Sequence, residues 1–258
     1  MIKKRIIAVI NIKKNLVVQS FSFQNYLPIG NIKYAIENLN RWNVDEILIQ
    51  CIDKSILNQG PDFDLIYKLK KNNISTPIIY GGGIRSASDC QELINSGVER
   101  ILIDRLLHYN LNEVTKISQL LGSQALIASL PIAFQKNQVI WFDYMNKIYK
   151  KFSNEIINFI NSGIFSEILI TDHKNEGIHN SFDKRILKIK IFKNINLILF
   201  GGISTKSQIE NIIKNKNVSA IAIGNFLHYK ELSYQKLKNY VTKNNHSIFR
   251  KEFYSANT

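Results

Sequence analysis

The chain has 258 residues, is 45% hydrophobic and carries a formal net charge of +14, so it can bury a large core without disulfides or a structural metal. Its N-terminal apolar run, residues 6–10, is too short for a signal peptide, and no run approaches the roughly 18 apolar residues of a membrane span. Two cysteines, Cys51 and Cys90, form neither a disulfide framework nor a zinc site. We therefore expect a cytoplasmic protein with no metal, no cofactor and no membrane contact.

The positive charge allows two interpretations. It could serve a polyanionic partner, either nucleic acid or a phosphorylated substrate. It could also reflect a lysine-rich composition spread over solvated helix faces. The lysines are dispersed on helical patterns, as in KIYKK and KLKK, and no nucleic-acid-binding motif accompanies them. We favour the second interpretation and expect no nucleic-acid partner.

Short apolar runs follow one another along the chain with little internal alternation, as expected for strands buried on both faces of a parallel sheet. The predicted strands are 5–12, 46–52, 77–81, 100–104, 125–130, 167–171, 196–201 and 220–224. Amphipathic stretches between them predict helices over 32–42, 64–71, 88–97, 155–163 and 207–215. Ser86 and Ser88 are candidate N-caps, and Gly97 and Gly163 are candidate helix stops.

An internal repeat points to a closed barrel. Residues 78–109 and 197–229 share an aromatic-Gly-Gly pattern and a Leu-His-Tyr ending, which places His108 and His228 120 residues apart. The Glu-Ile-Leu-Ile runs at Glu46 and Glu167, and the Lys-Asn pairs at 14–15 and 136–137, recur at nearly the same spacing. The repeat predicts an α/β fold, one (βα)₈ TIM barrel over 1–258, with half-barrels of about 1–121 and 122–245 and a tail at 246–258.

An open doubly wound sheet is the rival architecture. It would place a glycine-rich phosphate turn after the first strand, and none is present there. In a barrel, function lies at the C-terminal ends of the strands. Glycine-rich loops follow the third, seventh and eighth predicted strands, and such loops expose backbone N–H groups to anions. They could equally be tight turns alone, but their repetition favours phosphate binding by Gly82, Gly83, Gly201, Gly202, Gly224 and Asn225.

These loops, the repeat, the opening KKRII, and the segments GSQAL (122–126) and LHYKEL (227–232) resemble the cyclase subunit of imidazole glycerol phosphate synthase, HisF, over almost the whole chain. In that family a partner glutaminase, HisH, makes ammonia, which passes along the barrel axis to a substrate with two phosphates at the C-terminal face. The resemblance implies a heterodimer with a HisH-like glutaminase.

The resemblance implies a charged gate for ammonia at the N-terminal face. The matching positions hold Arg5, Glu46, Arg100 and Glu167, with Arg in one place where the family has Lys. A ring of alternating buried charges is costly unless every member is paired, which favours a gate, although a plug that only stabilises the barrel is the alternative. Glu99 falls where the family has an acid that docks the glutaminase.

The reaction face departs from the family. In the family, two aspartates act as general acid and base. Asn11 and the Leu130-Pro131 pair stand at their positions here, and these side chains exchange no proton near neutral pH. Cys51 stands where the family has a third acid on the second strand, although Asp53 lies two residues on, and Gln19 stands where a basic residue is expected after the first strand. The polar phosphate contacts after the fourth strand are Asp104 and Arg105, and Lys174 replaces an acid, although Glu176 keeps one in that loop. The catalytic residues stay unassigned, with Glu176 as a remnant.

Four functions follow from these features. The first is a HisF-like, ammonia-receiving subunit that resembles the paralogues of surface-polysaccharide (O-antigen) gene sets. Those paralogues supply nitrogen for an acetamidino sugar and act with a HisH-like glutaminase and a third, ATP-dependent sugar amidotransferase. The second is a working cyclase of histidine biosynthesis, with Glu176, Asp53 or Asp104 replacing the missing acids. The third is a non-catalytic activator or scaffold of the glutaminase. Nucleic-acid binding is the fourth.

Overall fold

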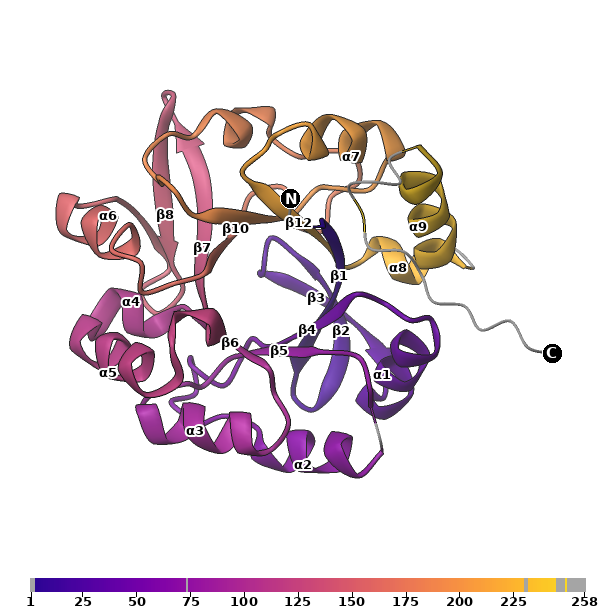
Figure 1. Cartoon of the computed structure of the whole chain (residues 1–258), viewed down its shortest axis with the longest axis horizontal. Coiled ribbons are helices and arrows are strands. Elements are labelled where there is room, and N and C mark those ends of the chain that lie inside the picture. Colours follow the sequence, from indigo (N-terminus) through magenta and orange to yellow (C-terminus); the bar gives the residue numbers. More distant parts are fainter. Residues whose placement is uncertain (1–2, 73, 230–231, 245–248, 250–258) are drawn as a thin grey trace.

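The computed structural model describes residues 3–72, 74–229, 232–244 and 249. Within this part of the chain, eight parallel strands pair side by side and close on themselves through β7 and β10 (Figure 1). The barrel strands are β1 (Arg5–Lys13), β4 (Glu46–Cys51), β5 (Ile78–Gly81), β6 (Arg100–Ile103), β7 (Leu126–Gln135), β10 (Glu167–Asp172), β11 (Asn196–Phe200) and β12 (Val218–Ile223). The predicted TIM barrel is confirmed, and the open sheet is excluded.

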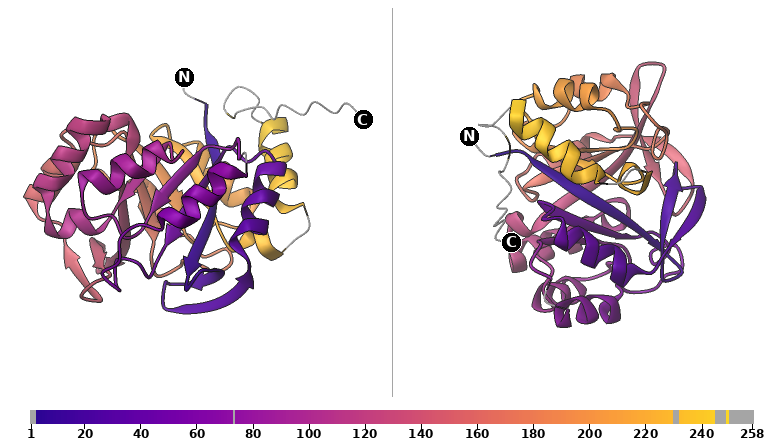
Figure 2. Two further views of the ribbon diagram at one scale, coloured as in Figure 1. Left: turned by 90° about the horizontal axis from the view of Figure 1, so that it is seen from below. Right: turned by 90° about the vertical axis from the view of Figure 1, so that its right-hand side faces the viewer.

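Helices surround the barrel as an outer layer (Figures 1 and 2). They are α1 (Ile32–Arg41), α2 (Phe63–Lys71), α3 (Ala87–Asn95), α4 (Arg105–Tyr109), α5 (Leu111–Leu121), α6 (Asn154–Ile160), α7 (Lys206–Ile213), α8 (Phe226–Tyr229) and α9 (Ser233–Asn244). The described part of the β10–β11 connection contains only a 3₁₀ turn, Lys184–Lys188. The five helices predicted from periodicity begin within one residue of their predicted starts, and Ser86 is the N-cap of α3.

Alternation along each strand divides the core into two layers. One face packs against the helices, and the other fills the barrel with aliphatic side chains, including Ile7, Leu48, Leu102, Ile127 and Leu169. Because side chains alternate along a strand, Arg5, Ile7, Val9 and Asn11 of β1 all point inward. From the N-terminal to the C-terminal end of the barrel, the inward-facing side chains of β1 are therefore charged at Arg5, apolar at Ile7 and Val9, and polar at Asn11.

Two hairpins extend the sheet beyond the barrel at its C-terminal end. β1 continues into β2 (Leu16–Phe21) and β3 (Asn25–Gly30), and β7 continues into β8 (Gln138–Asp143) and β9 (Ile148–Lys151). The first and fifth barrel strands thus run past residues 12 and 130, where the sequence pattern placed their ends. Positive φ angles at Lys14–Asn15 and at Lys136–Asn137 form the two turns, as tight antiparallel hairpins require. The repeated Lys-Asn pair marks two equivalent hairpin turns.

The division into half-barrels stays a prediction, and the expected tail at 246–258 lies outside the described residues apart from Phe249. That residue is buried and forms a single bridge with Lys4 at the start of β1. Among the described residues, no helix is both long and apolar enough to span a bilayer.

Candidate functional site

A closed ring of four charged residues lies at the N-terminal end of the barrel. Arg5 donates from Nη2 to both carboxylate oxygens of Glu167 at 2.5 and 2.7 Å, and its Nη1 lies 3.4 Å from Glu46 Oε1. Arg100 places Nη2 2.6 Å from Glu167 Oε2 and Nη1 3.9 Å from Glu46 Oε2. The strands β1, β4, β6 and β10 each supply one member, so the barrel brings together four residues that are distant in sequence.

The ring is held by charge pairing against the cost of burial. Between 6% and 14% of each of the four side chains is exposed. Burial raises the pKa of Glu167, but the guanidinium groups of Arg5 and Arg100 outweigh burial and hold that pKa below its usual value. Ser219 donates a further hydrogen bond to the same carboxylate. Arg5 and Arg100 therefore alternate with Glu46 and Glu167 around the ring, and each arginine contacts both carboxylates.

Glu99 lies at the outer edge of this end, directly before Arg100. It is exposed, and its carboxylate accepts a hydrogen bond from the backbone N–H of Ile78. Partial burial raises its pKa from the usual value. Glu99 therefore has a fixed direction while staying accessible from outside the barrel.

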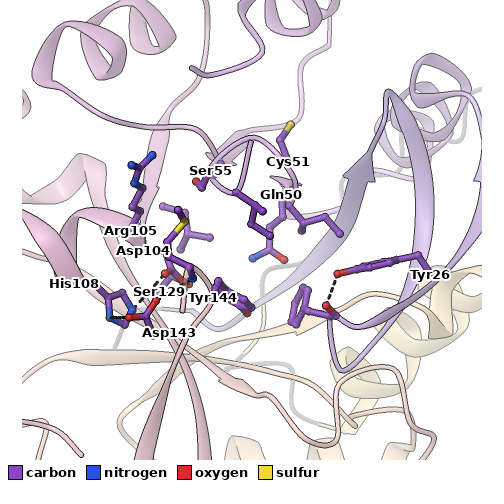
Figure 3. A pocket seen from close by; sticks show the side chains of 17 residues that line it. Tyr26, Gln50, Cys51, Ser55, Asp104, Arg105, His108, Ser129, Asp143 and Tyr144 are labelled. Atoms are coloured by element: carbon purple, nitrogen blue, oxygen red, sulfur yellow. Dashed lines mark hydrogen bonds and ion pairs between the residues drawn. The ribbon is translucent and has the colours of Figure 1, made fainter. Parts of the chain in front are cut away.

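At the opposite end, a cavity that we call the Asp104 pocket opens between β4, β5, β6 and the β8–β9 hairpin (Figure 3). Its lining includes Tyr26, Gln50, Gly82, Asp104, His108 and Tyr144. Gln50 points into the cavity, whereas the thiol of Cys51 points away from it (Figure 3) and packs in the outer core. Burial raises the pKa of Cys51 to about 12, so this thiol cannot replace the acid expected on the second barrel strand.

Two carboxyl groups and a histidine form one wall of this pocket. Asp104 Oδ2 accepts a hydrogen bond from Ser129 Oγ at 2.9 Å, and burial, with Asp143 nearby, raises the pKa of Asp104 to about 7. His108 lies between them, with Nε2 3.8 Å from Asp104 and Nδ1 3.9 Å from Asp143. Its ring stacks on Trp141 at 3.7 Å between centroids, and burial lowers its pKa to about 4.

Asp143 is ionised in this arrangement. It is fully buried, but hydrogen bonds from Lys150 at 2.6 Å and from Tyr109 and Asn146 at 3.0 Å hold its pKa below the usual value despite that burial. Asp143 is not among the residues predicted from sequence, because the hydrophobic pattern does not predict β8. The repeated Lys136-Asn137 pair was the available signal for the hairpin that carries it.

A second cavity, which we call the Gly202 pocket, lies between the ends of β10, β11 and β12. Its lining includes Glu176, His179, Gly201, Gly202, Gly224 and Asn225. Four of the six predicted phosphate residues thus meet here, and Gly82 lies in the other pocket. The side chain of Asn225 is already used, because it donates to Ser20 O at 2.7 Å and accepts from Ser20 N at 3.3 Å. Asn225 therefore holds the first hairpin in place as well as lining the pocket.

Backbone geometry requires glycine at both loops. Gly82 has φ +119°, and a Cβ there would lie 2.2 Å from Cys51 O. Gly202 has φ +68°, and a Cβ there would lie 2.6 Å from Phe182 N. These positions therefore need glycine for close packing whether or not an anion binds. Gly83 directs its N–H to Ser55 Oγ at 3.1 Å, so it is not free to bind a phosphate.

Glu176 holds the β2–β3 hairpin over the barrel. Its Oε2 accepts from Ser20 Oγ at 2.9 Å and from the backbone N–H of Phe23 at 3.2 Å. It is almost fully buried, and burial raises its pKa to about 7. Phe23 packs against the barrel interior, and its ring stacks on that of His173 with 6.1 Å between the ring centroids. Glu176 therefore links the second pocket to the position of the first hairpin.

The two positions of the missing acids point into the barrel but carry no acid. Asn11 is buried, and its Oδ1 has no hydrogen-bond partner among the described residues. Pro131 is buried in β7 and pairs with Thr171 of β10. Asp53, a proposed substitute, accepts a hydrogen bond from the backbone of Lys14 at 2.8 Å. No group of three or more His, Cys, Asp or Glu in the described residues has metal-site geometry.

Comparison with known proteins finds a family and several relatives that this chain resembles. A family model described as "Histidine biosynthesis protein" matches residues 5–233. Two relatives share the name "Putative imidazole glycerol phosphate synthase subunit hisF2". The Vibrio vulnificus protein is 29% identical over 90% of this chain and 86% of its own length. The Campylobacter jejuni protein is 29% identical over 92% and 95%.

A third relative, from Natranaerobius thermophilus, is named "Imidazole glycerol phosphate synthase subunit HisF". It is 24% identical over 94% of this chain and 97% of its own length. The similarity thus extends over both the charged ring and the two pockets. The resemblance to HisF drawn from the repeat, the glycine loops and the charged positions is confirmed.

Proposed function

The chain belongs to the histidine biosynthesis protein family, and we propose that it is a HisF-like synthase subunit that receives ammonia through its barrel from a HisH-like glutaminase. The observation that carries this proposal is the ring of Arg5, Glu46, Arg100 and Glu167, which closes one end of the barrel below an apolar middle layer. The proposed final acceptor is a surface-polysaccharide sugar, converted to its acetamidino form with a third, ATP-dependent amidotransferase.

The chemistry of the interior favours neutral ammonia over ammonium. A charged group that leaves water for an aliphatic interior must be paired there, and an uncharged small molecule needs no such pairing. The ring closes the N-terminal end while Arg5 and Arg100 hold Glu167. In the proposed cycle, docking of the glutaminase rearranges these ion pairs and lets ammonia enter without bulk water.

The reaction face supports a changed acceptor. Proton transfer to and from a substrate needs two titratable groups placed on either side of it, and positions 11 and 131 supply none. Among the three proposed substitutes, Asp53 binds the Lys14 backbone and Glu176 holds the β2–β3 hairpin. Asp104 lines a cavity and is the best remaining basis for the alternative, a working cyclase of histidine biosynthesis. The third possibility, a glutaminase activator, would need no ammonia path.

Binding to a HisH-like glutaminase is the first test. We expect a complex with micromolar or tighter affinity by calorimetry, and at least about tenfold weaker binding after Glu99→Lys, which reverses a charge at the proposed contact. Asp64→Lys makes the same charge change at an exposed position of α2 and should leave the affinity unchanged. Absence of a complex with the unaltered chain would refute the proposal.

The activator alternative is tested with the same complex. If ammonia moves inside the barrel, ammonia from glutamine should stay out of solution while an acceptor is present, and glutamate dehydrogenase can trap any that leaks. If the chain only activates the glutaminase, all the ammonia should reach the trap.

A further inference from the structure

The internal repeat makes the two pockets equivalent in position but not in chemistry. At the spacing of 120 residues, Gly82 corresponds to Gly202, and His108 corresponds to His228. Asp104, however, corresponds to Gly224. One half of the barrel therefore places a carboxyl group where the other half places only backbone.

The Asp104 pocket is unsuited to a phosphate. The carboxyl group of Asp104 lies in the cavity, and Ser129 fixes its direction. A second carboxylate, Asp143, lies behind His108. Arg105 does not offset them inside the cavity, because its guanidinium turns away and donates to Asn58 at 3.1 Å (Figure 3). Asp143 is neutralised by Lys150 at 2.6 Å, so Asp104 is the carboxyl group that faces a ligand, and a negative charge there disfavours an anion.

The same pocket offers acceptors that lack donors. Gln50 Oε1 is buried and has no hydrogen-bond partner among the described residues, and Figure 3 shows this side chain pointing into the cavity. Among the described residues, no hydrogen bond reaches Asp104 Oδ1, and the nearest basic side chain, the neutral His108, has its Nε2 3.8 Å away. Buried acceptors are costly unless a donor reaches them. The walls between them are aromatic, from Tyr26 and Tyr144.

We propose that the Asp104 pocket binds a group that carries hydroxyl or amino donors and no negative charge, with Asp104 and Gln50 as acceptors. The ligand of the C-terminal face then carries its anionic end in the Gly202 pocket alone, in contrast to a substrate with two phosphates. The inference deepens the proposed function by specifying the class of nitrogen acceptor. It does not require that the glutaminase partner be correctly identified.

Two probes test the two pockets separately in the full chain labelled with ¹⁵N-glycine. Inorganic phosphate supplies an anion, and Tris supplies an amino group with three hydroxyls. At about pH 8, above the pKa of Asp104, phosphate should shift the amide signals of Gly201, Gly202 and Gly224 and leave Gly82 and Gly83 unchanged. Tris should shift Gly82 and Gly83 only.

Asp104→Asn should weaken the Tris response about tenfold and allow phosphate to shift Gly82. Asp64→Asn removes the same charge from the exposed surface and should change neither response. Unchanged signals of the remaining glycines report that the variant is folded.

Phosphate shifts at Gly82 in the unaltered chain, no phosphate shift at Gly202, or a Tris response unaffected by Asp104→Asn would each overturn the proposal. None of these results depends on the glutaminase, so failure of the proposed function would be recognised separately in the binding experiment.

Discussion

Arg5 of β1 spans the mouth of the barrel to Glu167 of β10, with both carboxylate oxygens held at 2.5 and 2.7 Å. The two strands are separated in the barrel by β11 and β12. The ion pair therefore crosses the opening of the barrel and does not join neighbouring strands. It closes the N-terminal end with charge while the layer above it is aliphatic.

Arg5→Ala should cost stability and loosen the opening. Removing one partner of a buried ion pair leaves an uncompensated charge, which costs about 3 kcal/mol of unfolding free energy, measurable by urea denaturation. In the complex with the glutaminase, the variant should release more ammonia into the trap than the unaltered chain. Arg5→Lys keeps the charge and should leak less than Arg5→Ala. Equal release by all three proteins would mean that the ring is only a plug.

The purified chain should not turn over the ribosyl-carboxamide substrate of the cyclase at high ammonium concentration, because Asn11 and Pro131 cannot exchange protons. Free ammonium removes the need for a glutaminase, so only the C-terminal face is tested. Asn11→Asp alone should stay inactive, since the second group is still missing. Measurable turnover by the unaltered chain would favour the working-cyclase alternative, and Asp104→Asn would then be expected to reduce the rate by about 10²–10⁴.

Glu176 should make the protein less stable as pH rises. Burial raises its folded-state pKa to about 7, above the unfolded value of about 4.3. The folded state therefore binds the proton more tightly, and its contribution is complete below about pH 4 and is lost as pH rises through 7. Glu176→Gln should remove about 2–4 kcal/mol of this pH dependence between pH 4 and 8.

Urea denaturation of the two proteins across this pH range measures the difference. Asp104 and Asp172, whose pKa values burial also raises, are present in both proteins and cancel from the comparison. Parallel pH profiles would contradict the assigned role of Glu176.

His108 should be neutral and structural at pH 7. Burial lowers its pKa to about 4, so its ring proton signals should not titrate above about pH 5. His108→Phe preserves the stack on Trp141 and should change the unfolding free energy by less than about 1 kcal/mol, whereas His108→Ala should cost about 2–3 kcal/mol. A titration near pH 6.5 would mean that the ring is solvated and not packed.

Local pattern was sufficient to predict the barrel. Runs such as Glu167-Ile-Leu-Ile read as doubly buried strands because both faces of a parallel strand are covered, and the spacing of His108 and His228 indicated a duplication. The same pattern failed at β2, β3, β8 and β9, because polar residues interrupt their apolar runs, as Gln19 and Ser20 do in β2 and Asp143 does in β8. Their only sequence signal was the recurring Lys-Asn pair, whose meaning became clear from the positive φ angles of both residues.

Sequence by itself determined which residue types are available: four charges at strand starts, glycines at strand ends, and no acid at positions 11 and 131. Tertiary structure alone decided which of them meet and in what electrostatic state. Burial raises the pKa values of Asp104 and Glu176. Gln50 points into the cavity and Cys51 points away from it, while the side chain of Asn225 binds the first hairpin. These outcomes depend on neighbours distant along the chain, because desolvation and hydrogen-bond partners are properties of the packed interior.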